Sequence, residues 1–217
     1  MVRSTKSKLL SNKPRQVRDP EATKAQIIDA AESEFAKNGL NGARTEAIAA
    51  RSGVTKAMIY YYFESKEGLY QAVLQRPVTE FLDVAKQLHL EQLSAEEALK
   101  TFMRGAIAYE AAHRHRGMIL FHEANQNQGK YFQLTGWRAA FEQMFAILER
   151  GMTDGSFRKV DPLLVTMQIA GVCTFYFNAH ENLKHLFPDM QLLSPEMIEQ
   201  YTEEAIALIL AGVIPEK

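Results

Sequence analysis

One stretch of the chain, RTEAIAARSGVTKAMIYYYFESK at residues 44–66, constrains the fold more than any other. Thr45 is a suitable N-cap for a short helix, whose apolar residues recur at helical spacing. Gly53 favours the left-handed backbone that ends a helix tightly, and Thr55 can cap a second helix running to about Tyr62. Two short helices joined in this way predict a helix-turn-helix, whose second helix can enter a DNA major groove.

A helix ahead of this stretch completes a small domain. Between Thr23 and Asn38 apolar residues recur at helical spacing, and Gly39 ends the run. We expect this helix to hold the second short helix rigidly through a small core of Ile27, Ala31, Phe35, Ile48, Met58 and Phe63. A further helix begins after Ser65, and Pro77 within it predicts a kink or break near Gln75 and Arg76, because proline removes a backbone donor.

The remaining residues also indicate helices. Strong start signals occur at Ser94, which begins a capping box, and at Asp161 and Ser194, each followed by proline. Two more helices are expected at about 118–125 and 131–152. No stretch shows the alternation of a strand, so the predicted fold class is all-α with about nine helices. They comprise an N-terminal three-helix domain that contains the helix-turn-helix and a C-terminal helical bundle.

Composition and charge limit the possible environments and partners. The single cysteine, Cys173, rules out an intrachain disulfide and fits a reducing cytoplasm, and we expect neither a membrane-spanning helix nor a secretion signal. Residues 1–76 carry 13 Lys and Arg against 8 Asp and Glu, whereas the remainder carries 12 against 18. A basic N-terminal part can replace the counterions of a phosphate backbone.

These features divide the chain into three parts. Residues 1–19 form a basic arm that is expected to be flexible, either as a solvated tail or in contact with DNA phosphates or a minor groove. Residues 20–68 form the helix-turn-helix domain, and residues 69–217 form the C-terminal helical domain.

The N-terminal pattern resembles one known family. From about Ala22 to Leu74 the chain is similar to the DNA-binding domain of the TetR family (TetR/AcrR-like) of transcriptional regulators. The likeness rests on Gly39, Thr45, Ile48, Ala49, Gly53-Val54-Thr55, Ile59-Tyr60-Tyr61-Tyr62-Phe63 and Ser65-Lys66-Glu67. The resemblance implies a ligand-responsive regulator, most simply a repressor, that binds a near-palindromic double-stranded DNA operator as a dimer and is released by a small molecule. Activation, or a ligand acting as corepressor, stays open.

Hydroxyl groups, amines and helix starts in this domain can donate to phosphate oxygens. The expected phosphate contacts are Thr45, Tyr60, Tyr61 and Lys66. The family reads base edges at the positions of Lys56 and Ala57, and Thr55 and Arg44 are secondary candidates that can equally be solvated surface. Tyr61 and Tyr62 can instead pack inside the domain. Glu46 departs from a phosphate-binding surface and is expected to point away or to support the helix dipole.

The C-terminal helices point to a second copy of the chain. Residues 163–177 are apolar nearly all round, so this helix should be covered on two sides, once by its own domain and once by a partner. A two-fold interface is the simplest solution, and it agrees with the homodimer that the resemblance implies.

The resemblance also implies that residues 69–217 are a helical domain for effector (ligand) binding and dimerisation, with an effector pocket inside the bundle. Candidate apolar lining residues are Phe102, Met103, Phe121, Trp137, Phe141, Met167 and Phe175, each of which can equally be ordinary core. Candidate polar residues that could orient a small-molecule effector of unknown identity are His122, Gln168 and Asn178.

Two other classes of function were weighed. The densest histidine groups, near His113 and His122, lack the spacing of a metal site, and there is no phosphate-binding glycine loop or catalytic elbow. We therefore expect no enzyme activity, no cofactor and no metal. A purely structural helical protein would not need Tyr60, Tyr61 and Lys66 on a basic domain.

Overall fold

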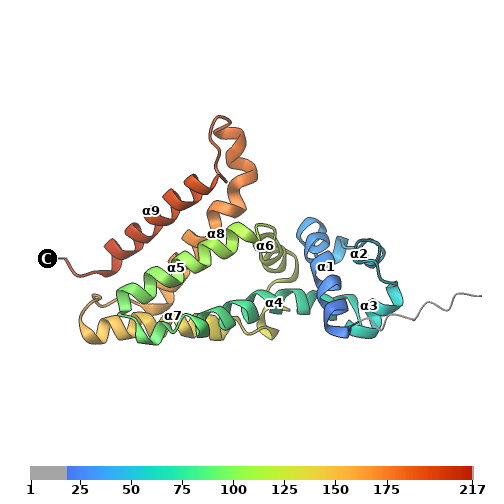
Figure 1. Ribbon diagram of the computed structural model, residues 1–217, viewed down its shortest axis with the longest axis horizontal. Coiled ribbons are helices and arrows are strands. Elements are labelled where there is room, and N and C mark those ends of the chain that lie inside the picture. Colours follow the sequence, from blue (N-terminus) through green and yellow to red (C-terminus); the bar gives the residue numbers. More distant parts are fainter. Residues whose placement is uncertain (1–18, 217) are drawn as a thin grey trace, which may run out of the picture.

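A computed structural model describes residues 19–216, and in this range it contains nine α-helices, two short 3-10 helices and no strand (Figure 1). The predicted all-α class is therefore confirmed. Helices α1 (Pro20–Gly42), α2 (Thr45–Ser52) and α3 (Lys56–Phe63) form the predicted helix-turn-helix unit. The predicted basic arm lies outside the described residues except for Asp19, whose carboxylate caps α1 by accepting from the Glu21 amide (3.0 Å).

The turn between α2 and α3 follows the sequence signals closely. Gly53 adopts the left-handed conformation (φ 67°), and the Thr55 hydroxyl accepts from the Met58 amide (3.3 Å). The expected N-cap role of Thr45 is wrong by one residue, because the carbonyl of Arg44 already accepts the first helical hydrogen bonds of α2. Gly39 interrupts α1 with a positive φ of 64°, but a final turn continues to Gly42.

The core of this unit holds α3 as predicted. Ile27, Phe35 and Ile48 are fully buried, Ile59 is the fully buried residue of α3, Phe63 packs against this core, and Met58 is partly buried. The core also takes in residues 69–74 of the next helix and Ile119. The predicted boundary at residue 68 thus falls inside a helix that serves both parts, and it stays a prediction.

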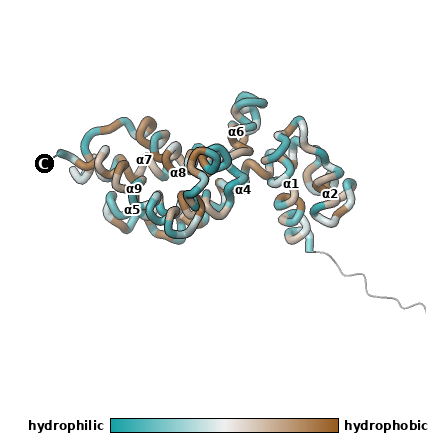
Figure 2. The backbone as a smooth tube through the Cα atoms, turned by 90° about the horizontal axis from the view of Figure 1, so that it is seen from above, coloured by the Kyte–Doolittle hydropathy of each residue, from teal (hydrophilic) through white to brown (hydrophobic). Residues whose placement is uncertain are grey.

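Helix α4 (Lys66–Gln87) connects the two parts without interruption. Ser65 caps it by accepting from the Gly68 amide (2.9 Å). Of the kink or break predicted near Gln75 and Arg76, the break does not occur, because Pro77 is buried within a helix that is continuous from Lys66 to Gln87. The Arg76 guanidinium donates to Glu80, one turn later in the same helix. Figure 2 shows α4 leading from α1 and α2 at one end to the bundle at the other.

The C-terminal bundle contains α5 (Ala95–Ala112), α6 (Arg116–Asn127), α7 (Trp137–Asp154), α8 (Pro162–Leu186) and α9 (Pro195–Val213), with 3-10 turns at Leu90–Gln92 and Phe132–Leu134. Ser94, Asp161 and Ser194 cap α5, α8 and α9 as predicted. Helix α7 begins at Trp137 rather than Tyr131, because the 3-10 turn comes first.

Gly117 lies in the first turn of α6 and does not separate two helices. A Cβ atom at this position would come within 2.0 Å of Asn178 Oδ1 on α8, so glycine allows α6 and α8 to approach closely.

Judged by length and composition alone, helix α8 could cross a membrane, whereas no membrane-spanning helix was predicted from the sequence. The core helix of a soluble protein can be equally long and apolar, and 28% of the apolar 18-residue segment of α8 is buried. The exposed apolar residues of α8 include Leu163, Leu164, Met167 and Phe175. This helix therefore has one face in the bundle and one apolar face outside it.

Candidate nucleic-acid interface and ligand cavity

The outer face of α3 presents polar and aromatic side chains on a rigid base. Ile59 anchors the helix in the core, whereas Lys56 and Ala57 are exposed and Tyr61 is 80% exposed. Tyr60 is 40% exposed. A two-turn helix that is anchored in the core on one side and exposed on the other can enter a DNA major groove, as the recognition helix of a helix-turn-helix does.

Lys56 is already paired with a neighbour from α2. Its ammonium donates to Glu46 Oε1 and lies 5.8 Å from the centre of the Tyr60 ring. The hydrogen bond with Lys56 lowers the pKa of Glu46 and raises the pKa of Lys56. Of the two roles expected for Glu46, pointing away is therefore wrong, whereas its place in the first turn of α2 suits support of the helix dipole. Glu46 also pairs with the cation proposed for base contact.

Glu46→Gln should consequently strengthen DNA binding several-fold, because it releases Lys56 and removes a negative charge near the phosphates. Fluorescence anisotropy with a labelled operator duplex measures the effect. The matched control is Glu142→Gln, which breaks the exposed Arg138–Glu142 pair of α7. Equal affinities of the Glu46 variant and the unaltered protein would show that the pair does not compete with DNA.

A shallow surface hollow brings together four of the predicted contact residues. Arg44, Thr45, Tyr60 and Lys66 all line it. Two of these are less free than expected: Thr45 is buried, and the Lys66 ammonium donates to the carbonyls of Ala43 (3.2 Å) and Asn41 (3.4 Å). Lys66 thus also satisfies the carbonyls at the end of α1, and its phosphate contact stays a prediction.

The two secondary candidates for base contact, Thr55 and Arg44, lie at the N-termini of α3 and α2. Thr55 is exposed although its hydroxyl caps α3, and Arg44 is exposed at the entrance to α2. Tyr62 is half-buried, with its ring edge-on to Tyr61 and Phe63, so it packs on the domain.

A cavity of about 120 Å³ lies in the C-terminal bundle between α4, α5, α6, α7 and α8. Three of the predicted lining residues reach it, namely Phe102, Trp137 and Phe141. The polar lining residues were not predicted from the sequence; they are Tyr109, Glu110, Arg116, Thr166 and Thr174. Glu110 could have been suspected, because it is a lone acid within the otherwise apolar run AIAYEAA.

The other seven predicted residues do not line this cavity. Met103 is packed in the core, and Asn178 lies against Gly117. The ring of His122 lies with Nε2 3.2 Å from the Ala36 carbonyl, in the contact between α6 and α1. The remaining four residues are exposed on the outer faces of α6 and α8: Phe121, Met167, Gln168 and Phe175. The residue types of these four positions suit a ligand pocket, but the sides of α6 and α8 that carry them face away from the interior of the bundle.

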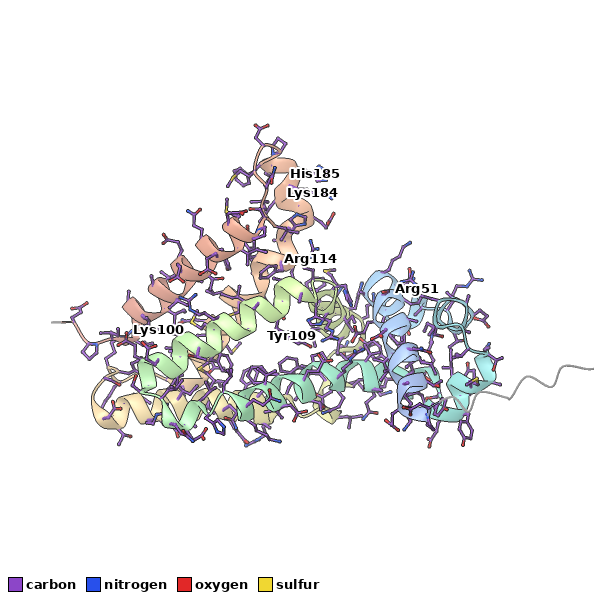
Figure 3. The ribbon with its side chains drawn as sticks, viewed as in Figure 1. Arg51, Lys100, Tyr109, Arg114, Lys184 and His185 are labelled. Atoms are coloured by element: carbon purple, nitrogen blue, oxygen red, sulfur yellow. The ribbon has the colours of Figure 1, made fainter. Side chains whose placement is uncertain are left out.

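One wall of the cavity belongs to a buried ion cluster that reaches the DNA-binding part. Arg116 of α6 is 5% exposed, and it pairs with Glu32 of α1 (3.0 Å) and with Glu80 of α4. Tyr109, labelled in Figure 3, lies between α5 and α4, where its hydroxyl donates to Glu80 (2.7 Å). Arg76 of α4 pairs with Glu80, Glu32 and Asp29.

The electrostatics of the two carboxyl groups nearest Arg116 differ. Burial alone raises the pKa of Glu80, but hydrogen bonds from Arg116, Tyr109 and Arg76 outweigh it and hold the pKa at about 2. Burial raises the pKa of Glu110 to about 7, and the nearby charge of Arg116 offsets only part of this effect. Glu80 is thus a fixed charge, whereas Glu110 is a cavity carboxyl that titrates near neutrality.

Known proteins match both halves of the chain. A family model described as bacterial regulatory proteins, tetR family, matches residues 27–73, and one described as Tetracyclin repressor-like, C-terminal domain, matches residues 96–209. The HTH-type transcriptional repressor NicS of Pseudomonas putida is 33% identical over 162 residues, 71% of this chain and 75% of NicS. The HTH-type transcriptional repressor SCO4008 of Streptomyces coelicolor is 37% identical over 106 residues, about half of each chain (49% and 52%).

A solved structure supports the fold. The transcriptional regulator FadR from Bacillus subtilis, in complex with stearoyl-CoA, superposes with a TM-score of 0.69 at 19% identity, covering 87% of this chain and 98% of FadR. The helix-turn-helix unit, the C-terminal bundle and the two family matches agree. This chain belongs to the TetR family of bacterial regulatory proteins and is a DNA-binding transcriptional regulator.

Proposed function

We propose that this regulator is a repressor that binds a near-palindromic operator as a homodimer and is released by a small molecule. The observation that carries the proposal is the outer face of α3, where Lys56, Ala57 and Tyr61 are exposed beside the hollow lined by Tyr60 and Lys66. Lysine can donate to guanine, an alanine methyl can contact thymine, and tyrosine can donate to phosphate. We place its action in the bacterial cytoplasm and assign it no catalytic step.

The dimer rests on the apolar outer face of α8. Leu164, Met167 and Phe175 are more than half exposed, and Leu208 of α9 is 66% exposed. A contiguous apolar surface of this kind favours a two-fold contact with the same surface of a second copy. Such a dimer would place two α3 helices one DNA turn, or a multiple, apart.

The ligand response rests on the position of the cavity. Tyr109 and Arg116 line it, and through the ion cluster they contact Glu80 of α4 and Glu32 of α1. A ligand that favours one arrangement of these helices therefore also biases the DNA-binding part. Couplings of about 1–3 kcal/mol are typical and change occupancy roughly 5–150-fold.

Selection of enriched sequences from a random pool of duplexes tests the proposal, and the operator obtained allows affinities to be measured. Tyr61→Ala should weaken operator binding by about tenfold to a hundredfold, because each half-site loses a hydrogen bond to a charged phosphate. Affinity should also fall steeply with salt. The matched control is Phe121→Ala, an aromatic residue of α6 that is 62% exposed and lies outside the helix-turn-helix. No enriched palindrome, or equal losses for both variants, would contradict the proposed function.

A further inference from the structure

The size of the bundle cavity limits the ligand to a ring-sized molecule. Its volume of about 120 Å³ is comparable to that of an engineered protein cavity, ~150 Å³, that admits benzene. Aromatic side chains form much of the wall, including Phe81, Phe102, Trp137 and Phe141. The stearoyl-CoA of the FadR complex has an 18-carbon acyl chain, which this cavity cannot hold without extensive repacking.

Polar atoms in the same wall lack protein partners. Within residues 19–216, buried atoms without a hydrogen-bond partner include Glu110 Oε2, Arg116 Nε, Trp137 Nε1 and Thr166 Oγ1, and all four residues line the cavity. Buried polar groups are nearly always hydrogen-bonded, so each such atom calls for a partner. The indole N–H of Trp137 and the Nε–H of Arg116 can only donate, the Thr166 hydroxyl does either, and a carboxyl group accepts and, when neutral, can also donate. A ligand acceptor can therefore serve Trp137, Thr166 or Arg116, and a ligand donor can serve Glu110.

The charges around the cavity disfavour an anion. The only cation in its wall, among the described residues, is Arg116, and the carboxylates of Glu32 and Glu80 already pair with it. Glu110 adds a carboxyl group to that wall, and its raised pKa shows that burial opposes a charge there. A ligand carboxylate would face Glu110, and the charge of Arg116 is already balanced by Glu32 and Glu80, so the carboxylate would be buried without a compensating cation, which is costly. A ligand ammonium would add a second cation to the wall that holds Arg116, and the only other charge partner there would be Glu110, whose charged form is disfavoured by burial.

We propose that the cavity binds an uncharged, ring-sized aromatic molecule bearing an amide-like group, which donates to Glu110 and accepts from Trp137 and Thr166. This inference rests on the proposed function only in taking the cavity as the effector site. Aromatic faces hold the ring, and the polar atoms distinguish the uncharged donor–acceptor group from an acid, an amine or a bare hydrocarbon.

Four probes of similar shape test the class: benzamide, benzoate, benzylamine and toluene. Binding to the full chain without DNA is followed by the fluorescence of Trp137, the single tryptophan, and by ligand-observed NMR. Benzamide is expected to bind in about the millimolar range, as suits so few atoms, and at least about tenfold tighter than benzoate. Tighter binding of benzoate or of benzylamine, or no binding of benzamide, overturns the inference.

Two variants of threonines on α8 locate the polar contact. Thr166→Val removes an unpartnered hydroxyl at nearly constant shape and should weaken benzamide about threefold to tenfold while leaving toluene unchanged. The matched control is Thr174→Val, because the Thr174 hydroxyl also belongs to the cavity wall but already donates to the Ala170 carbonyl (2.8 Å). Equal effects of the two variants on benzamide binding would also overturn the inference. The four-probe series uses the unaltered protein, so it tests the inference even if a variant fails to fold.

The two proposals fail separately in this design. If benzamide binds with the expected selectivity but leaves operator affinity unchanged, the ligand class stands and the effector role of the cavity fails. If a palindromic operator is bound and no probe shows the expected selectivity, the repressor proposal stands and the ligand class fails.

Discussion

Replacing Arg116 by methionine is expected to lower the free energy of unfolding by about 3 kcal/mol, which corresponds to a fall in melting temperature of roughly 6–12 °C. The guanidinium is almost fully buried between Glu32 and Glu80, and Glu32 is 5% exposed at its side chain. Methionine keeps much of the volume but leaves two carboxylates without their main partner. The effect lies at the lower end of the range for broken buried pairs because Arg76 still contacts both carboxylates.

Thermal and denaturant unfolding measure this effect, and two further variants check its cause. Arg138→Met removes an arginine that is 91% exposed, so it should cost almost nothing. Adding Glu80→Gln to Arg116→Met should recover part of the lost stability, because it neutralises one of the stranded carboxylates. A loss of similar size in the Arg138 variant, or no recovery in the double variant, would show that the buried pair is not responsible.

The same cluster gives the stability a pH dependence. Glu80 has a pKa of about 2 in the folded chain, below its ordinary 4.5. A depressed pKa contributes stability that is fully present above about pH 4.5 and is lost as the pH falls toward 2. Arg116→Met removes a hydrogen bond that lowers this pKa, so the stability of the variant should vary less across that window.

The sequence was most informative where local chemistry alone decides the structure. Caps at Thr55, Ser65, Asp161 and Ser194 depend on one side chain and amides a few residues away, and all four were predicted. The left-handed turn at Gly53 is of the same kind. Pro77 shows the limit of such reasoning, because packing and the bonds of Arg76 keep α4 continuous across a residue that disfavours helix.

The cavity depended on information that one sequence does not hold. Residue types identified Phe102, Trp137 and Phe141, but they could not tell which side of α8 faces inward. Met167 and Phe175 were expected inside and lie outside, whereas Thr166 is buried in the cavity wall. The ion cluster joins residues as far apart as Glu32 and Arg116, a contact that no local pattern indicates.

The outward position of Phe175 on α8, which was not predicted from the sequence, leads to the second prediction with a large effect. Phe175→Glu is expected to raise the dissociation constant of the proposed homodimer at least about a hundredfold, because the 69% exposed ring lies on the apolar outer face. In a two-fold interface both copies carry the new carboxylate, so two charges must be buried without a partner. Sedimentation velocity or light scattering at micromolar concentration should show a monomer in place of a dimer.

The matched control is Phe121→Glu, which places the same charge on a ring that is 62% exposed on α6 and should leave the dimer intact. DNA binding should separate the two variants in the same way. A monomer engages one half-site at a time, so Phe175→Glu should lose most of its preference for the full palindrome over a single half-site. A dimer that survives Phe175→Glu but dissociates with Phe121→Glu would move the interface from α8 to α6. The geometry that brings two α3 helices onto one operator would then have to be built from the other face of the bundle.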